Sequence, residues 1–236
     1  MMAKKQQQSW KQKAHSRSPA AVANLRSKHR AARAFSRHRG AHGTAQAPFV
    51  PPEDWYEPEG TPGYRFVEQT PGAGYRHVVT PEEVRNRLAQ LPESFTVSLE
   101  VVQFSKMTRK KRNYPCYGMQ WGSTIYLYPI ETDLVEHFSS KPKPQQWNEA
   151  RMYGGQWERD GACGWKLVWS LAAVKDYYLN NILIHELGHL LDERNTSYED
   201  RERYAEWFAV RYGYQMSQRF DPQRRSRKTV RRHHKR

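Results

Sequence analysis

Residues 178–191 read YLNNILIHELGHLL. This stretch is the most informative part of the sequence about the fold. Its apolar side chains recur at helical spacing, and the pattern starts upstream at Leu171, with Ser170 available as an N-terminal cap. The sequence therefore predicts one long helix with a buried face. Two histidines and a glutamate lie in its middle, where polar side chains are costly to bury unless they have partners.

His185 and His189 are one helical turn apart, so their ring nitrogens can reach a single metal ion at about 2.0–2.1 Å. Glu186 lies to the side, where its carboxylate can act on a water molecule without being a ligand. The alternative is that the two histidines only form hydrogen bonds with backbone or solvent. The pattern alone leaves both interpretations open.

A third ligand has to come from another segment, because a catalytic zinc ion normally has three protein ligands. Glu202 and Glu206 are one turn apart in a second helical stretch that ends near Tyr214. Their like charges repel each other. A metal ion would offset this repulsion if Glu202 binds the ion and Glu206 accepts a hydrogen bond from a ligand histidine. Two alternatives stay open: Glu206 is itself the third ligand, or Glu199, Glu202 and Glu206 form a solvated acidic face.

The stretch His185-Glu186-Leu187-Gly188-His189, followed by Glu202-x-x-Ala205, resembles the gluzincin class of zinc metallopeptidases. In that class the third ligand is a Glu on a following helix. Over about residues 178–214 the chain is similar to the small intracellular gluzincins of the ImmA/IrrE family. Those proteins usually carry Asn where this chain has Glu206, so the match to that family is incomplete.

The resemblance implies a zinc-dependent metallopeptidase that acts on a protein or peptide substrate. It implies Zn²⁺ held by His185, His189 and Glu202, with Glu186 as the general base and Glu206 supporting a ligand histidine. An extended substrate would add to the edge of a strand ahead of the helix. Candidates for a side chain that stabilises the oxyanion are Tyr198, Tyr204 and Tyr212.

The expected fold is α+β and zincin-like, with a small, mostly antiparallel sheet of about three strands packed on the active-site helix and the ligand helix. A short helix is predicted over residues 80–91, and strands over residues 95–101, 123–128 and 165–169. The strand at 123–128 is the first candidate for the substrate edge, and 165–169 is the second. Five positive charges at 106–112 are expected at a hairpin tip, or alternatively in a loop that binds phosphate or an acidic substrate.

The net charge of +15 belongs to the two ends of the chain. Residues 1–47 contain no acidic residue and contribute +11, and residues 218–236 contribute +8, which leaves −4 for the part between them. We predict a disordered basic tail (1–47), a Pro/Gly-rich linker (48–78), a zincin-like domain (79–217) and a basic C-terminal tail (218–236). Such tails can bind nucleic acid without sequence preference.

The tails raise two alternative functions. One is a nucleic-acid-associated zincin-domain protein that acts on DNA- or RNA-bound partners. The other is a structural protein of a virus or mobile element whose metal site serves only stability.

Two cysteines are too few for a disulfide framework, and no apolar run approaches the roughly 20 residues of a membrane span. We therefore expect a soluble intracellular protein, most naturally cytoplasmic. An organelle transit peptide is an alternative interpretation of the acid-free start.

Overall fold

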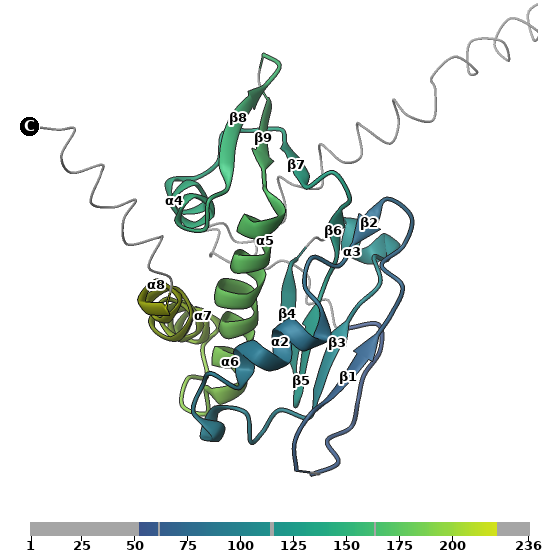
Figure 1. The fold of residues 1–236 in the computed structure, drawn as a ribbon, viewed down its shortest axis with the longest axis vertical. Helices are drawn as coiled ribbons and strands as arrows, with labels where there is room; N and C mark the ends of the chain where they lie inside the picture. The colour runs from purple at the N-terminus through teal and green to yellow at the C-terminus, as the bar shows by residue number, and fades with distance from the viewer. Residues whose placement is uncertain (1–51, 61, 114–115, 163, 221–236) are drawn as a thin grey trace, which may run out of the picture.

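The computed structural model describes residues 52–60, 62–113, 116–162 and 164–220. Helices and small sheets alternate along the chain in a mixed α+β arrangement (Figure 1). Within this part of the chain, no helix is both long and apolar enough to cross a membrane. The N-terminal tail predicted at 1–47 and most of the tail predicted at 218–236 lie outside the described residues. Nucleic-acid binding by these tails therefore stays a prediction.

The predicted long helix is confirmed as a continuous run of three segments, here called the central helix (residues 171–191). They are α5 (Leu171–Tyr177), the π-helical turn η2 (Tyr178–Ile182) and α6 (Leu183–Leu191). Ser170 caps the helix, since its Oγ accepts a hydrogen bond from the Ala173 backbone N–H at 3.1 Å. The central helix runs between the largest sheet and the C-terminal helices (Figure 1).

The largest sheet has four strands in the order β1-β3-β5-β4. These are β1 (Arg65–Glu68), β3 (Val101–Phe104), β5 (Thr124–Leu127) and β4 (Gly118–Trp121). The first three are parallel to one another and β4 is antiparallel to β5, so the mostly antiparallel sheet expected from the sequence is wrong here. All residues of β3 and β5 are buried, as is usual for parallel strands covered on both faces.

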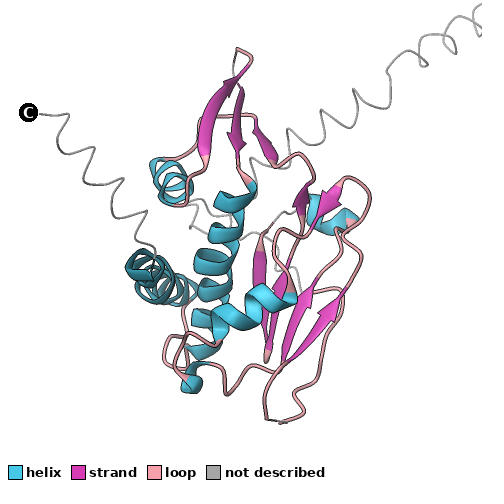
Figure 2. Cartoon of the chain, in the orientation of Figure 1, coloured by secondary structure: helices cyan, strands magenta, loops and turns pink. Residues whose placement is uncertain are grey.

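The other two sheets are small and antiparallel. One pairs β2 (Tyr75–Arg76) with β6 (Ile130–Glu131). The other, at the far end of α5 (Figure 2), has β7 (Val135–Phe138), β9 (Gly164–Val168) and β8 (Gln156–Asp160) in that order. The remaining elements are α2 (Pro81–Leu88), the 3₁₀ turn η1 (Glu93–Phe95), α3 (Arg109–Asn113), α4 (Pro144–Met152), α7 (Tyr198–Phe208), the π-helical turn η3 (Ala209–Tyr214) and α8 (Gln215–Phe220).

The strand predicted at 95–101 is wrong in its position, because β3 begins only at Val101. The preceding residues form η1 and turns. The apolar side chains there do not share one face of a strand: Val97 is 68% exposed, whereas the Phe95 ring packs on Phe208 and Tyr212. Phe95 and Leu99 are thus packed on or in the core while Val97 points to solvent, and the segment between them is a 3₁₀ turn followed by turns.

Part of the predicted linker at 48–78 belongs to the sheet. Residues 65–68 form β1, which pairs in parallel with β3, and Val78 is buried in the core. The segment ahead of β1 lies along the domain, where the backbone N–H groups of Glu59 and Gly60 donate to the Glu100 carboxylate. The domain thus begins well before residue 79.

The basic cluster at 106–112 is neither a hairpin tip nor an open loop, because residues 109–113 form α3. Lys111 is only 1% exposed. Its Nζ lies 3.5 Å from Cys116 Sγ and 4.3 Å from the centre of the Tyr128 ring. At least this lysine faces the protein interior and not a phosphate in solvent.

Gly213 allows the two π-helical turns to cross closely. A Cβ at this position would lie 1.8 Å from the backbone oxygen of Asn180 in η2. We therefore expect Gly213→Ala to lower the free energy of unfolding by about 1–3 kcal/mol. An exposed helical Gly→Ala change would instead stabilise by up to about 1 kcal/mol, so the sign of the effect is diagnostic.

Chemical denaturation of Gly213→Ala measures this effect, with Gln215→Ala at an exposed position of α8 as the control. Unchanged or increased stability of Gly213→Ala would show that η2 and η3 do not approach as described.

Candidate metal centre

Three side chains predicted as metal ligands converge on one point. The Nε2 atoms of His185 and His189 are 3.1 Å apart, and the Glu202 carboxylate oxygens lie 3.6 Å from the first and 3.4 Å from the second. Bonds of about 2.0–2.1 Å to one tetrahedral ion separate ligand atoms by about 3.3–3.4 Å. The observed spacings are close to this value, so the three side chains could hold a single metal ion.

A buried oxygen supports this fit. Within the described residues, Glu202 Oε2 is buried and has no hydrogen-bond partner. The two facing imidazole nitrogens cannot satisfy each other fully either, since only one of them can donate in their 3.1 Å contact. Buried polar atoms are normally paired, and a cation among these three groups would satisfy all of them at once.

Gly188 sets the distance between the two ligand-bearing helices. A Cβ on Gly188 would lie 3.0 Å from the Cα of Ala205 in α7. Because neither residue has a large side chain, α7 approaches α6 closely enough for Glu202 to reach both histidines. The glycine inside the histidine motif thus serves helix packing.

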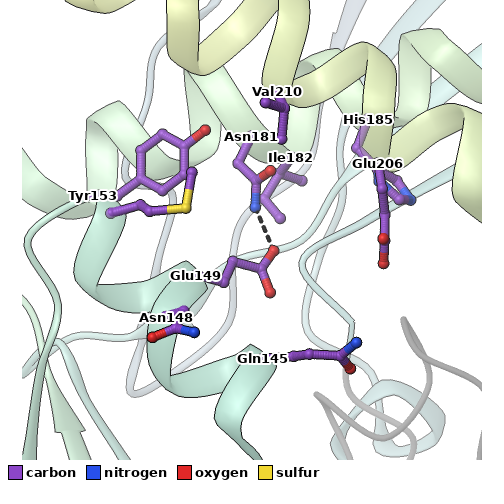
Figure 3. Close-up of a pocket in the computed structure, with 10 residues that line it drawn as sticks. Gln145, Asn148, Glu149, Tyr153, Asn181, Ile182, His185, Glu206 and Val210 are labelled. Atoms are coloured by element: carbon purple, nitrogen blue, oxygen red, sulfur yellow. Dashed lines mark hydrogen bonds between the residues drawn. The ribbon is translucent and has the colours of Figure 1, made fainter.

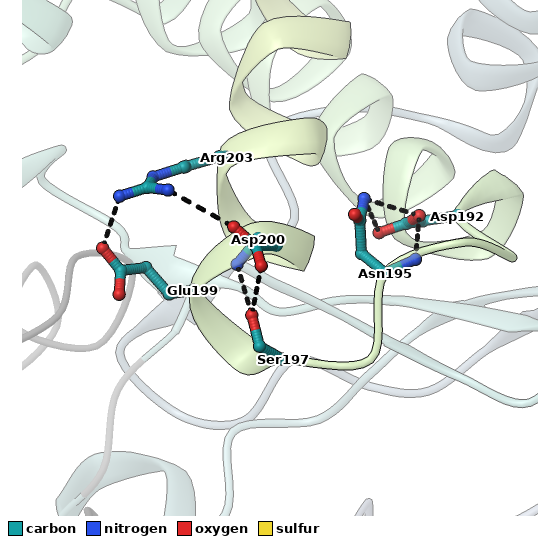
Figure 4. A network of polar contacts seen from close by, with 6 residues as sticks. All are labelled: Asp192, Asn195, Ser197, Glu199, Asp200 and Arg203. Carbon is teal, nitrogen blue, oxygen red and sulfur yellow. Dashed lines mark hydrogen bonds and ion pairs between the residues drawn. The ribbon is translucent and has the colours of Figure 1, made fainter.

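The turn between α6 and α7 is held by local hydrogen bonds (Figure 4). The Asp192 carboxylate accepts from the Asn195 side-chain amide at 2.9 Å, and Ser197 Oγ accepts from the Asp200 backbone N–H at 3.1 Å. Ser197 is thereby the N-cap of α7. These bonds fix where α7 begins and hence the direction in which its side chains point.

Glu199 lies on a solvated acidic face, as one alternative for the three glutamates proposed, but Glu202 does not. Glu199 is exposed and pairs with Arg203 at 2.6 Å (Figure 4). The Glu202 side chain is only 14% exposed and faces the histidines. The group that could hold a metal contains Glu202 and does not include Glu206.

The pKa shifts of His185 and Glu202 show how these two side chains act on each other. Burial acts to lower the pKa of His185, but Glu202 and Glu186 outweigh it, so the pKa is raised. Burial acts to raise the pKa of Glu202, but the two histidines lower it below its ordinary value. The site therefore favours a positive charge between the imidazoles and the carboxylate, which a metal ion supplies in place of a proton.

Glu186 lies between α6 and the edge strand β4. It is 3% exposed, and burial raises its pKa, with His185 and His189 opposing the shift. A Cβ on Gly118 of β4 would lie 2.9 Å from the Glu186 Cγ and Oε1 atoms. Only a glycine allows β4 to pass this close to the carboxylate.

The terminal strand of the sheet that lies against α6 is β4, which sequence reasoning missed. The strand predicted at 123–128 is confirmed as β5, but it lies inside the sheet between β3 and β4. The strand predicted at 165–169 is confirmed as β9, which is the middle strand of its own sheet. Both expectations for the substrate edge are therefore wrong. The signal for β4 is weak because the strand is short and contains a glycine.

A role for Tyr198, Tyr204 or Tyr212 in stabilising an oxyanion stays a prediction. The rings of Tyr204 and Tyr212 pack on Phe208, and Tyr198 is 62% exposed. Glu206 lines a cavity together with His185 (Figure 3), so its predicted support of a ligand histidine stays a prediction.

Comparisons of the chain with models of known protein families, with curated proteins and with solved structures find no match.

Proposed function

We propose that this protein is a zinc-dependent metallopeptidase. The observation that carries the proposal is the convergence of His185, His189 and Glu202 at 3.1–3.6 Å on one side of the buried Glu186 carboxylate. A zinc ion held by these three ligands would polarise a peptide carbonyl and lower the pKa of water toward about 7.

Glu186 supplies the proton transfers. Its position one residue after His185 places the carboxylate beside the three ligand side chains without making it one of them. Because burial raises its pKa, the carboxylate is a better proton acceptor than an exposed glutamate. It takes a proton from the attacking water and delivers it to the leaving amine.

β4 supplies the binding edge for an extended substrate. It is the outermost strand of the sheet beside α6, and Gly118 brings its backbone against Glu186. A peptide that adds to this edge forms main-chain hydrogen bonds and passes next to the general base.

Metal removal tests the proposal. Purified protein should bind about one zinc ion per chain, and chelation should abolish cleavage of a mixture of unstructured peptides. Removal of zinc should also lower the melting temperature, because zinc at 100 times its Kd stabilises the folded state by about 2.7 kcal/mol. Elemental analysis, peptide mass spectrometry and thermal denaturation measure the three effects.

Readdition of zinc should restore activity and stability, whereas magnesium should not, because it prefers oxygen ligands in octahedral geometry. Cleavage that survives complete removal of zinc would rule out the proposed chemistry.

A further inference from the structure

The two helices that carry the proposed zinc ligands cross at a pair of π-helical turns. η2 lies in the central helix just before α6, and η3 directly follows α7. The two turns are in contact, and Gly213 of η3 lies against the backbone oxygen of Asn180 in η2. π-helical turns are rare and frequently occur at functional sites. This crossing is a second point, besides Gly188, at which the two helices are fixed to each other.

The side chain of Arg87 bridges this crossing from α2, which packs on η2 (Figure 1). Its Nε donates a hydrogen bond to Asn180 Oδ1 in η2 at 2.6 Å, and its Nη2 donates to the backbone oxygen of Tyr212 in η3. Arg87 is only 5% exposed. The guanidinium is planar, so the directions of its N–H groups are fixed relative to each other. One side chain thereby sets where η3 lies relative to η2.

Asn180 is itself held within the central helix. Its Nδ2 donates to Asp176 Oδ1 at 2.8 Å, one turn earlier in the same helix. Its backbone oxygen accepts a hydrogen bond from the Tyr153 hydroxyl at 3.1 Å. The acceptor that Arg87 binds is therefore firmly placed, and His185 lies little more than one turn further along the same helix.

Arg87 is a costly side chain for a purely stabilising role. Burial lowers its pKa, with Tyr153 and Asp176 opposing the shift. Its Nη1 atom is buried and has no hydrogen-bond partner among the described residues. Apolar side chains often stabilise a protein interior as well as buried charges do. An apolar side chain could not supply the two directed bonds that join η2 to η3.

The geometry of the helix pair links this bridge to the metal centre. The contacts Asn180–Gly213 and Gly188–Ala205 are eight residues apart on both helices, so the helices run in opposite directions and touch at two matched points. Glu202 lies one turn from Ala205. With one contact alone, α7 could rotate on α6 and move the carboxylate, whereas metal–ligand distances tolerate only about 0.2 Å.

We propose that Arg87 is a positioning residue for the metal centre: by holding η3 on η2, it fixes the angle at which Glu202 meets His185 and His189. This inference rests on the zinc site of the proposed function. It assigns Arg87 no contact with the metal or the substrate.

Zinc affinity and thermal stability of two variants test the inference in the full chain. Arg87→Met keeps an unbranched stem but removes both hydrogen bonds. Val84→Ala, at a fully buried position of the same helix, loosens the packing of α2 and keeps both bonds. We expect both variants to lower the melting temperature. Only Arg87→Met should weaken zinc binding, by about 2–30-fold, which is the range for residues that act on a site through packing.

The affinities are compared at a temperature at which circular dichroism shows each metal-free variant to be folded, so that global unfolding does not contribute. Arg87→Lys keeps the charge and can form one of the two bonds. Its zinc affinity should lie between those of Arg87→Met and the wild type, and it replaces Arg87→Met in the comparison if that variant does not fold.

Cobalt(II) in place of zinc reports the ligand geometry directly, through d–d absorption bands that are intense for tetrahedral sites. The bands should be weaker or shifted in Arg87→Met and unchanged in Val84→Ala. A zinc affinity in Arg87→Met equal to that of the wild type, or an equal loss in Val84→Ala, would overturn the inference and leave the metallopeptidase proposal intact. A wild type that binds no zinc would instead overturn the metal centre itself.

Discussion

Glu186→Gln is expected to lower kcat/KM for peptide cleavage by about 10²–10⁴-fold while leaving zinc bound. Gln has nearly the shape of Glu but cannot accept a proton from water at neutral pH. The side chain lies between α6 and Gly118 of β4, so an isosteric change keeps this packing. Steady-state kinetics and zinc content of the same preparation measure the two parts of the prediction.

The control is Glu193→Gln, two residues after the end of α6 and exposed to solvent. It should retain full activity. If Glu186→Gln also retained wild-type activity with zinc in place, Glu186 would not be the general base, and the proposed proton transfers would be wrong.

Glu202→Gln is expected to weaken zinc binding by more than about 100-fold. Replacing a residue that only orients a ligand costs about 10–100-fold in metal affinity, and loss of an anionic ligand should exceed that range. The neutral amide also removes the negative charge that lies 3.4–3.6 Å from the two imidazoles. Competition titration with a chromophoric chelator measures the affinity.

Glu206→Gln provides the decisive comparison, since it should fall within the range for a supporting residue. Glu199→Gln, on the exposed face that pairs with Arg203, should leave the zinc affinity unchanged. A larger loss for Glu206→Gln than for Glu202→Gln would identify Glu206 as the third ligand.

Helices and strands whose signal comes from residues adjacent in sequence could be predicted from the sequence. The central helix, with its Ser170 cap, follows from local spacing, and β5 and β9 follow from short apolar stretches. Strand pairing depends on residues far apart in sequence, and so the parallel order β1-β3-β5 was not foreseen. The position of β4 at the sheet edge was missed for the same reason, although that strand lies against Glu186.

Helical periodicity was sufficient to bring His185 and His189 onto one face and to place Glu186 beside them, because these residues lie within two turns of one helix. It could not choose between Glu202 and Glu206. That choice depends on how α7 crosses α6 at Gly188 and Ala205, and on the turn held by Asp192 and Ser197. The distance between two helices follows from packing of the folded chain, and the same packing brought Arg87 next to Asn180.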